Sequence, residues 1–361
     1  MKLVDEFRES RLIKSLVSRI NEAATGTYRF MEVCGGHTSA IHRFGLKSLL
    51  STRIELVSGP GCPVCVTGTG FIDKAVYLSG ERKNIITTFG DLMRVPGTAS
   101  TLEKEKARGA DIRIVFSPLE ALRMAAVETG RRVVFLGIGF ETTAPGTAAT
   151  VTEAEKTGIS NFYILGSHKV MPPAMDLLLR EGANVDGFIC PGHVAAIAGS
   201  SIFDFIPDKH GIGCVISGFE PTDILQSVYM LINQVNRKHP LTEIQYTRAV
   251  TAGGNLIAKK LMEDVFEDED MYWRGFGVIP SGGLKLQKKY ETRDASLLAD
   301  GQFPEDIKEG RCRCSDILRG RLIPLQCPLF KTVCNPENPA GACMVSPEGA
   351  CNAWFRYKTD E

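Results

Sequence analysis

The sequence predicts an α/β fold built mainly on parallel sheets. Short apolar runs, such as Val133 to Leu136 and Phe162 to Leu165, alternate with segments of helical periodicity through residue 235. Strands that are apolar on both faces are typical of parallel sheets covered by helices. The end of the chain differs, because six of the eleven cysteines fall between Cys312 and Cys351 among many Pro and Gly residues. We therefore expect a smaller, cysteine-rich C-terminal domain.

The order of the elements follows from apolar runs and turn residues. After an N-terminal amphipathic helix, we expect strands at 28–33, 54–57, 85–88, 112–116, 133–136, 162–165, 187–189 and 214–217. Helices are expected at 39–50, 71–79, 119–129, from about 144 to 156, and at 173–180, 193–198 and 222–235. Ser117 and Pro118 are a good N-cap and first-turn pair for one of them. Further on, we interpret the acidic residues 263–270 as a solvated face and 275–283 as a Gly-rich loop.

A chain of 361 residues is long enough for two or three domains. We predict boundaries near 140–150 and 240–245, giving domains 1–145, 146–242 and 243–361. Two internal echoes indicate a duplication: 34–41 resembles 190–197, and 139–143 resembles 218–222. Their offsets differ, so a simple tandem repeat does not fit. Two related lobes that exchange segments would explain the echoes, and so would convergent strand-to-helix turns.

Composition excludes several classes of function. Lys plus Arg is 42 and Asp plus Glu is 42, so no basic excess points to nucleic acid or to a membrane surface. The N-terminus has no signal-peptide pattern, and the apolar runs are too short to span a bilayer. We therefore expect a cytoplasmic, reducing location, where many cysteines indicate metal or redox chemistry.

The C-terminal cysteines predict an iron–sulfur cluster. Four thiolates on a cluster would hold together a segment that Pro and Gly keep from forming a regular core, and an adjacent redox pair would use the remaining two. A structural zinc site is the main alternative, although zinc sites usually come as two short CxxC pairs and would leave two thiols unexplained. Secreted disulfides are a further alternative. The six residues are Cys312, Cys314, Cys327, Cys334, Cys343 and Cys351.

Three more cysteines lie where predicted strands end. Cys62 and Cys65 form a CxxC motif between a strand and a helix, a position that lowers a thiol pKa. The motif alone fits half a zinc knuckle, a thioredoxin-like dithiol, an iron-ligand pair or two buried structural residues. Cys34 ends another strand and is followed by two glycines. If the two strands are neighbours, three thiolates converge on one site that is open to catalysis or transfer.

Other polar residues also fall at strand ends, where parallel sheets bind ligands. Asp91 and Glu141 are two of them. His37, next to the Cys34 turn, fits a fourth ligand, an acid/base or a hydrogen-bonded turn residue. Cys190 and Cys214 stand in apolar strands and are interpreted as core residues.

These motifs together resemble the hydrogenase maturation protein family HypD. The matching segments cover essentially the whole chain and are 31–38, 58–65, 88–97, 139–145, 341–345 and 348–351. The resemblance implies a scaffold and redox protein for assembly of the Fe(CN)2CO group of NiFe-hydrogenases. It would act with the small chaperone HypC and receive cyanide from HypE. The implied fold is two related α/β domains plus a C-terminal domain with a 4Fe–4S cluster.

The resemblance also implies roles for single residues. Cys34, Cys62 and Cys65 match thiols around the transient iron centre, and His37, Asp91 and Glu141 would orient ligands or move protons. The cluster ligands would be Cys312, Cys327, Cys334 and Cys351, which leaves Cys314 and Cys343 as a pair for thiol–disulfide exchange. Two alternatives stay open: a thiol–disulfide oxidoreductase with an iron–sulfur cluster, and a docking platform without redox turnover.

Overall fold

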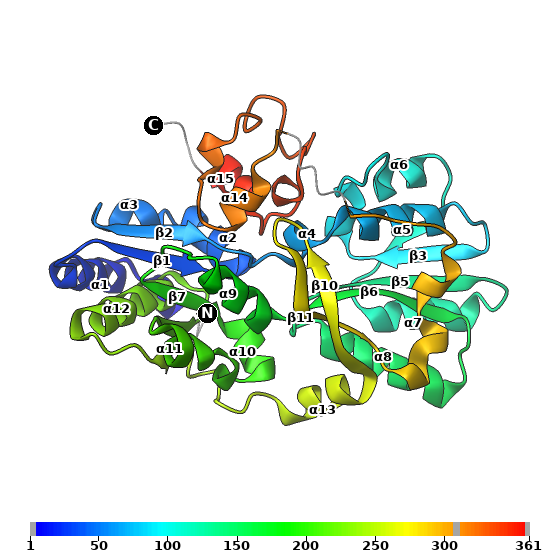
Figure 1. Ribbon diagram of the computed structural model, residues 1–361, viewed down its shortest axis with the longest axis horizontal. Helices are drawn as coiled ribbons and strands as arrows, with labels where there is room; N and C mark the ends of the chain where they lie inside the picture. The colour runs from blue at the N-terminus through cyan, green and yellow to red at the C-terminus, as the bar shows by residue number, and fades with distance from the viewer. Residues whose placement is uncertain (1–4, 306–310, 358–361) are drawn as a thin grey trace.

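A computed structural model describes residues 5–305 and 311–357, and it contains two sheets (Figure 1). The first has the order β2-β1-β7-β8-β9 and is parallel throughout. Its strands are β1 (Tyr28–Glu32), β2 (Ile54–Ser58), β7 (Gly187–Pro191), β8 (Gly213–Ser217) and β9 (Thr242–Ile244).

The second sheet has the order β10-β11-β6-β5-β3-β4. Its parallel part is β3 (Asn84–Thr88), β4 (Ile112–Ile114), β5 (Arg132–Gly139) and β6 (Phe162–Lys169). An antiparallel hairpin, β10 (Phe266–Trp273) and β11 (Gly277–Leu286), extends it. The predicted α/β class with mainly parallel sheets is confirmed.

Helices connect the strands and cover the sheets. The α-helices are α1 (Ser10–Ala23), α2 (Gly35–Arg43), α3 (Leu46–Leu49), α4 (Pro63–Val66), α5 (Thr69–Ser79), α6 (Leu102–Ala107), α7 (Pro118–Val127), α8 (Ala144–Thr157), α9 (Met171–Arg180), α10 (Gly192–Ala198), α11 (Phe205–His210), α12 (Pro221–Arg237), α13 (Leu256–Val265), α14 (Cys314–Leu318) and α15 (Ala350–Tyr357). The 3-10 helices are η1 (Asp5–Arg8), η2 (Gly90–Arg94), η3 (Ser200–Phe203), η4 (Lys288–Arg293), η5 (Ala295–Leu298), η6 (Pro324–Gln326) and η7 (Ala342–Met344). No helix in the described part of the chain is both long and apolar enough to cross a membrane.

Local chemistry explains where the elements agree with the sequence and where they differ. The Ser117 side chain accepts a hydrogen bond from the Glu120 N–H at the start of α7, as predicted. The helix expected at 39–50 is wrong in its bounds, because α2 starts at Gly35 and Gly45, with φ of 61°, separates it from α3. The loop expected at 275–283 is also wrong. Most of it is β11, and the acidic stretch before it lies largely on β10, where Glu267 and Asp268 are exposed.

The sheets divide the chain at points other than the predicted boundaries. The chain leaves the first sheet after Ser58, builds β3 to β6, and returns to the first sheet at Gly187. Each sheet therefore contains strands from both sides of residue 145, and the boundaries at 145 and 242 stay a prediction about folding units. The echoing segments 34–41 and 190–197 follow β1 and β7, which are direct neighbours.

Residues 311–357, called the C-terminal segment below, lie across the junction of the two sheets (Figure 1). Its helix α15 packs on α2, and η7 packs on α4. One apolar cluster continues from both sheets into this segment and includes Met31, Val134 and Met344, all at most 1% exposed. The turns after β1 and β2, which carry Cys34 and the Cys62–Cys65 pair, therefore lie against the cysteine-rich segment.

Candidate thiol and metal site

Strand pairing brings the Cys34 turn against the Cys62 turn. β1 and β2 are in parallel register with Glu32 opposite Ser58, so both turns leave the same edge of the first sheet. The Gly35 N–H donates to the Gly61 carbonyl oxygen at 2.9 Å. A Cβ at Gly61 would lie 2.1 Å from the Cys34 backbone nitrogen, so only glycine permits this approach. The two strands are therefore neighbours, which was the condition for the thiols to gather.

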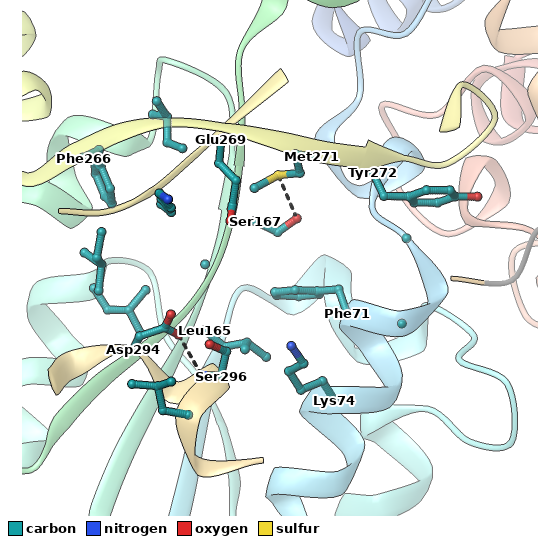
Figure 2. Close-up of a pocket in the computed structure, with 18 of the residues that line it drawn as sticks. Phe71, Lys74, Leu165, Ser167, Phe266, Glu269, Met271, Tyr272, Asp294 and Ser296 are labelled. Atoms are coloured by element: carbon teal, nitrogen blue, oxygen red, sulfur yellow. Dashed lines mark hydrogen bonds between the residues drawn. The ribbon is translucent and has the colours of Figure 1, made fainter. Parts of the chain in front are cut away.

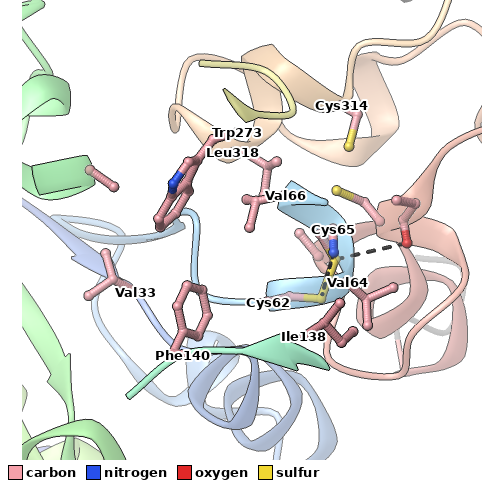
Figure 3. Packing of buried hydrophobic residues seen from close by; sticks show 14 of the residues in the cluster. Val33, Cys62, Val64, Cys65, Val66, Ile138, Phe140, Trp273, Cys314 and Leu318 are labelled. Carbon is pink, nitrogen blue, oxygen red and sulfur yellow. Dashed lines mark hydrogen bonds between the residues drawn. A yellow bond between two sulfur atoms is a disulfide. The ribbon is translucent and has the colours of Figure 1, made fainter. Parts of the chain in front are cut away.

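Cys62 and Cys65 are joined by a disulfide with a Cα–Cα distance of 5.2 Å. Cys62 is the N-cap of α4, and its Sγ accepts from the Cys65 N–H at 3.2 Å. Cys62 is 3% exposed and Cys65 is 0% exposed. Figure 3 shows the pair packed among Val64, Val66, Ile138 and other apolar side chains. The motif is thus a dithiol–disulfide pair, and its reduction would release two thiols beside Cys34.

The Cys34 thiol sits at the N-terminus of α2 and is partly exposed. Burial and the nearby Glu348 carboxylate raise its pKa to about 12, while hydrogen bonds from the backbone N–H groups of Gly36 and His37 act in the opposite direction. A cation at the sulfur would offset the cost of ionising it, because a metal ion deprotonates a coordinating thiol. Without such a cation, the Cys34 sulfur is held as a neutral thiol.

Two acidic residues that the sequence analysis missed flank Cys34. Glu32 is 2% exposed, accepts from Thr38 Oγ1 at 2.5 Å and from the Cys34 N–H at 3.1 Å, and burial raises its pKa to about 7. A carboxylate inside the apolar run 30–33 was the available signal. Glu348 comes from the C-terminal segment, and a Cβ at Gly35 would lie 2.4 Å from the Glu348 Cβ. Burial raises the Glu348 pKa as well.

Asp91 reaches the same neighbourhood from the second sheet. It follows β3 on η2, and its Oδ2 accepts from Ser346 Oγ at 2.7 Å. Its charge also raises the pKa of Glu348. The structure thus brings Asp91, Glu348 and Cys34 together through the C-terminal segment.

Glu141 lies after β5 and is turned toward α9. Its Oε1 accepts from the Met171 N–H at 2.9 Å, and burial raises its pKa to about 7. Its Oε2 is buried without a hydrogen-bond partner among the described residues. Ile138 and Phe140, on the same stretch, belong to the apolar cluster around Cys62 (Figure 3). Glu141 therefore follows a stretch that packs near the disulfide, and its carboxylate accepts a hydrogen bond from the N-terminus of α9.

The His37 ring is buried away from the thiols. Its Nε2 is 2.9 Å from the Gly218 carbonyl oxygen, so Nε2–H donates, and burial lowers the pKa of the ring to about 4. The ring stacks on Phe219 at 4.6 Å, and the exposed His193 stacks on the same phenyl group at 3.8 Å. The hydrogen bond to Gly218 is thus present, whereas Nδ1 is buried without a hydrogen-bond partner among the described residues, so the ligand and acid/base roles stay predictions. Phe219 was not identified, although it lies in the echo 218–222 that singled out this segment.

The six C-terminal cysteines line one small cavity together with apolar residues. Burial and the neighbouring thiols of Cys312 and Cys327 raise the pKa of Cys334. Burial raises that of Cys351, which neighbours the other sulfurs. Cys343 differs, because a hydrogen bond with Cys314 lowers its pKa, although burial leaves the net value raised. Among the residues that the structure describes, no group of three or more Cys, His, Asp or Glu side chains has an arrangement that could hold a metal ion.

The cavity and the disulfide are close neighbours. Cys65 Sγ lies 3.9 Å from the Ala342 carbonyl oxygen, and Cys343 is the next residue. Arg274, at the β10–β11 turn, joins the same region: its N–H donates to the Val66 carbonyl oxygen at 2.8 Å, and its Nε donates to that of Thr67 at 2.9 Å. Figure 3 shows Cys314 on the C-terminal side of this group. The peptide unit between Ala342 and Cys343 therefore lies between the Cys62–Cys65 disulfide and the six-cysteine cavity.

Two linked sheets that hold a CxxC disulfide against a six-cysteine cavity define a cysteine-rich α/β protein whose C-terminal segment is consistent with metal binding. The family profile described as "Hydrogenase formation hypA family" and labelled HypD matches residues 11–358. The hydrogenase maturation factor HypD2 of Bradyrhizobium diazoefficiens is 45% identical, over 99% of this chain and 97% of its own. The hydrogenase maturation factors HypD of Escherichia coli and Azotobacter vinelandii are each 43% identical, with 100% and 99% of this chain covered and 99% and 97% of theirs. The chain belongs to the HypD family of hydrogenase maturation factors.

Proposed function

We propose that the protein is a scaffold and redox protein that acts in the cytoplasm to assemble the Fe(CN)2CO group of NiFe-hydrogenases. The observation that carries this proposal is the contact between the Cys34 turn and the Cys62–Cys65 disulfide beside the six-cysteine cavity. Relatives of this chain are named as hydrogenase maturation factors. The partners proposed with it, a HypC-type small chaperone and a HypE-type cyanide donor, rest on the family resemblance.

The first site consists of Cys34, Cys62 and Cys65, and the iron that it binds is the substrate of the assembly reaction. Reduction of the Cys62–Cys65 disulfide consumes two electrons and two protons and yields two thiols. Together with Cys34 they form three soft ligands for iron, each losing its proton as the metal binds. Three protein ligands on a six-coordinate iron leave three positions for two cyanides and one CO, so a partner's thiolate would replace one of the three cysteines. Glu32, which already hydrogen-bonds the Cys34 backbone, and Glu348 place two carboxyl groups next to the three cysteines, and their raised pKa values let them hold or release a proton there.

At the second site, the six-cysteine cavity, we place a 4Fe–4S cluster that would be held by Cys312, Cys327, Cys334 and Cys351, as the family resemblance implies. All four sulfurs border one cavity, and their charges act on one another. A bound cluster would supply electrons one at a time. The hydrogen-bonded Cys314 and Cys343 are left as a dithiol next to Cys65. A thiolate of this pair would attack the Cys62–Cys65 disulfide, which leaves a 314–343 disulfide and a reduced CxxC.

Metal and sulfide analysis of the protein purified without oxygen tests the proposal. We expect about four iron and four sulfide per chain, and one further iron in the complex with the small chaperone. Cys34→Ala should lose only the further iron, and the core variant Cys190→Ala should lose none. Zinc in place of iron and sulfide would overturn the cluster assignment.

The oxidation state of the 314–343 pair during cofactor assembly separates the alternatives. A docking platform without redox turnover predicts no change. A general thiol–disulfide oxidoreductase, which the CxxC disulfide favours, predicts reduction of unrelated disulfide substrates in the absence of iron.

A further inference from the structure

Strand β6 has an incompletely paired edge inside the second sheet. On one side, β5 pairs with it from Phe162 to His168. On the other side, β11 pairs only with His168 and Lys169, and Asp294 forms a single bridge to Ile164. No strand in the described ranges pairs with residues 165–167 on this side. The hairpin and the 294 segment thus leave a gap between them.

Gly166 presents its backbone to this gap. The Val133 N–H donates to the Asn161 carbonyl oxygen, whereas the Val170 N–H donates to the Gly282 carbonyl oxygen. The backbone N–H and C=O groups of odd-numbered β6 residues therefore point to β5, and those of even-numbered residues point to the opposite edge. Gly166 is exposed although it lies in an inner strand, and a Cβ built on it meets nothing within 4 Å. Glycine in a strand interior weakens the strand and often marks the approach of a ligand or another backbone.

A cavity of about 560 Å³ opens at the same edge. Figure 2 shows Phe266, Glu269 and Met271 of β10 on one wall, Phe71 and Lys74 of α5 on another, and Ser296 of η5 on a third. The apolar side chains are accompanied by charges of both signs, and Lys285 pairs with Glu267 at 3.2 Å. The cavity therefore has no single charge that would select a simple ion.

We propose that this cleft binds an extended peptide segment of a partner protein, which forms a β-bridge to Gly166 and places an apolar side chain in the cavity. One donor and one acceptor on the same strand residue match the N–H and C=O of an extended chain. At about 3.3 Å per residue, the unpaired residues 165–167 leave room for about three peptide residues along the strand, and the ends of a longer peptide must turn away from it. The cleft is separate from the cysteines, so this inference does not depend on the proposed function.

A positional-scanning library of N-acetylated, C-amidated tetrapeptides is the probe, with binding to the full-length protein measured by NMR. We expect pools with an apolar residue at an inner position to bind. Gly166→Pro removes the N–H and should weaken that binding about tenfold or more. Gly166→Ala is the matched control and should bind as the parent does, because its Cβ enters open space.

A second variant guards against disturbance of β6 by proline. Leu297 lines the cavity from η5 and is 62% exposed, so Leu297→Trp narrows the cleft without touching the strand. It should also weaken binding about tenfold. Absence of binding by every pool, or equal affinity in both variants and the parent, would overturn the inference. Equal displacement of the peptide by acetamide would assign the cleft to small amides instead.

Discussion

The two sulfur-rich regions are built in opposite ways. Cys34 and the Cys62–Cys65 pair stand at the ends of paired strands, and a backbone hydrogen bond from Gly35 to Gly61 fixes their turns. The six C-terminal cysteines lie in a segment whose regular elements are two short α-helices and two 3-10 helices, and Cys314, Cys327, Cys334, Cys343 and Cys351 are themselves buried. The first region owes its shape to a sheet, so it should form without metal. The second packs its sulfurs into an apolar cluster but has little regular secondary structure, so its order should depend on what the sulfurs bind.

The largest effect is expected from Cys351→Ser. Loss of one cluster ligand should lower iron and sulfide content about tenfold or more and open the C-terminal segment to proteases. Cys343→Ser, a neighbouring buried cysteine outside the proposed ligand set, is the control and should keep its cluster. Equal loss in both variants would contradict the division of the six cysteines.

Cys34→Ala should affect function and leave the fold intact. Because the sheet positions this residue, we expect an unchanged cluster spectrum and unfolding midpoint. Hydrogenase activity matured in cells should fall about tenfold or more, through loss of a thiolate ligand. A variant that matures hydrogenase normally would remove Cys34 from the site.

Glu141→Gln should change the pH dependence of stability. Burial raises the pKa of Glu141 from 4.5 to about 7, so the folded state binds more protons than the unfolded state between these values. Its contribution is therefore fully present below pH 4.5 and is lost as the pH rises through 7. The parent should lose roughly 3 kcal/mol more than the variant across this window, as measured by urea unfolding. Parallel profiles would show that the carboxyl group titrates normally.

Ser117→Ala gives the smallest effect and serves as a scaffold reference. It removes the N-cap hydrogen bond of α7, far from the cysteines, and should cost about 1 kcal/mol of unfolding free energy. Iron content should not change. A loss of iron in this variant would mean that the metal sites respond to general destabilisation.

Much of the fold could be predicted because its strands are short apolar runs. The eight expected strands are present, since burial on both faces leaves a clear pattern. The hairpin β10–β11 could not be recognised in this way. Its first strand is acidic because it is an exposed edge, and its second contains Gly282 and Gly283, where a Cβ would meet Ile279 and Met271 at under 3 Å. The chain crosses from the first sheet to the second and later returns, and these crossings leave no local pattern in the sequence.

The site was predictable as far as residues follow strands. Pairing of β1 with β2 sets the Cys34 and Cys62 turns side by side, and Asp91 is linked to this neighbourhood through Ser346 of the C-terminal segment. Glu348 could not be found, because it reaches Cys34 only through packing of a segment remote in sequence. The orientation of the His37 ring toward Gly218 also depends on a strand that the local motif does not contain.

The absence of a side chain at Gly61 has a mechanical consequence. Its Cα lies so close to the Cys34 backbone that a Cβ would clash, and a backbone hydrogen bond from Gly35 joins the two turns. A movement that accompanies opening of the 62–65 bond would be transmitted directly to the neighbouring sulfur. The redox state of one turn would thus set the position of the other without any dedicated hinge.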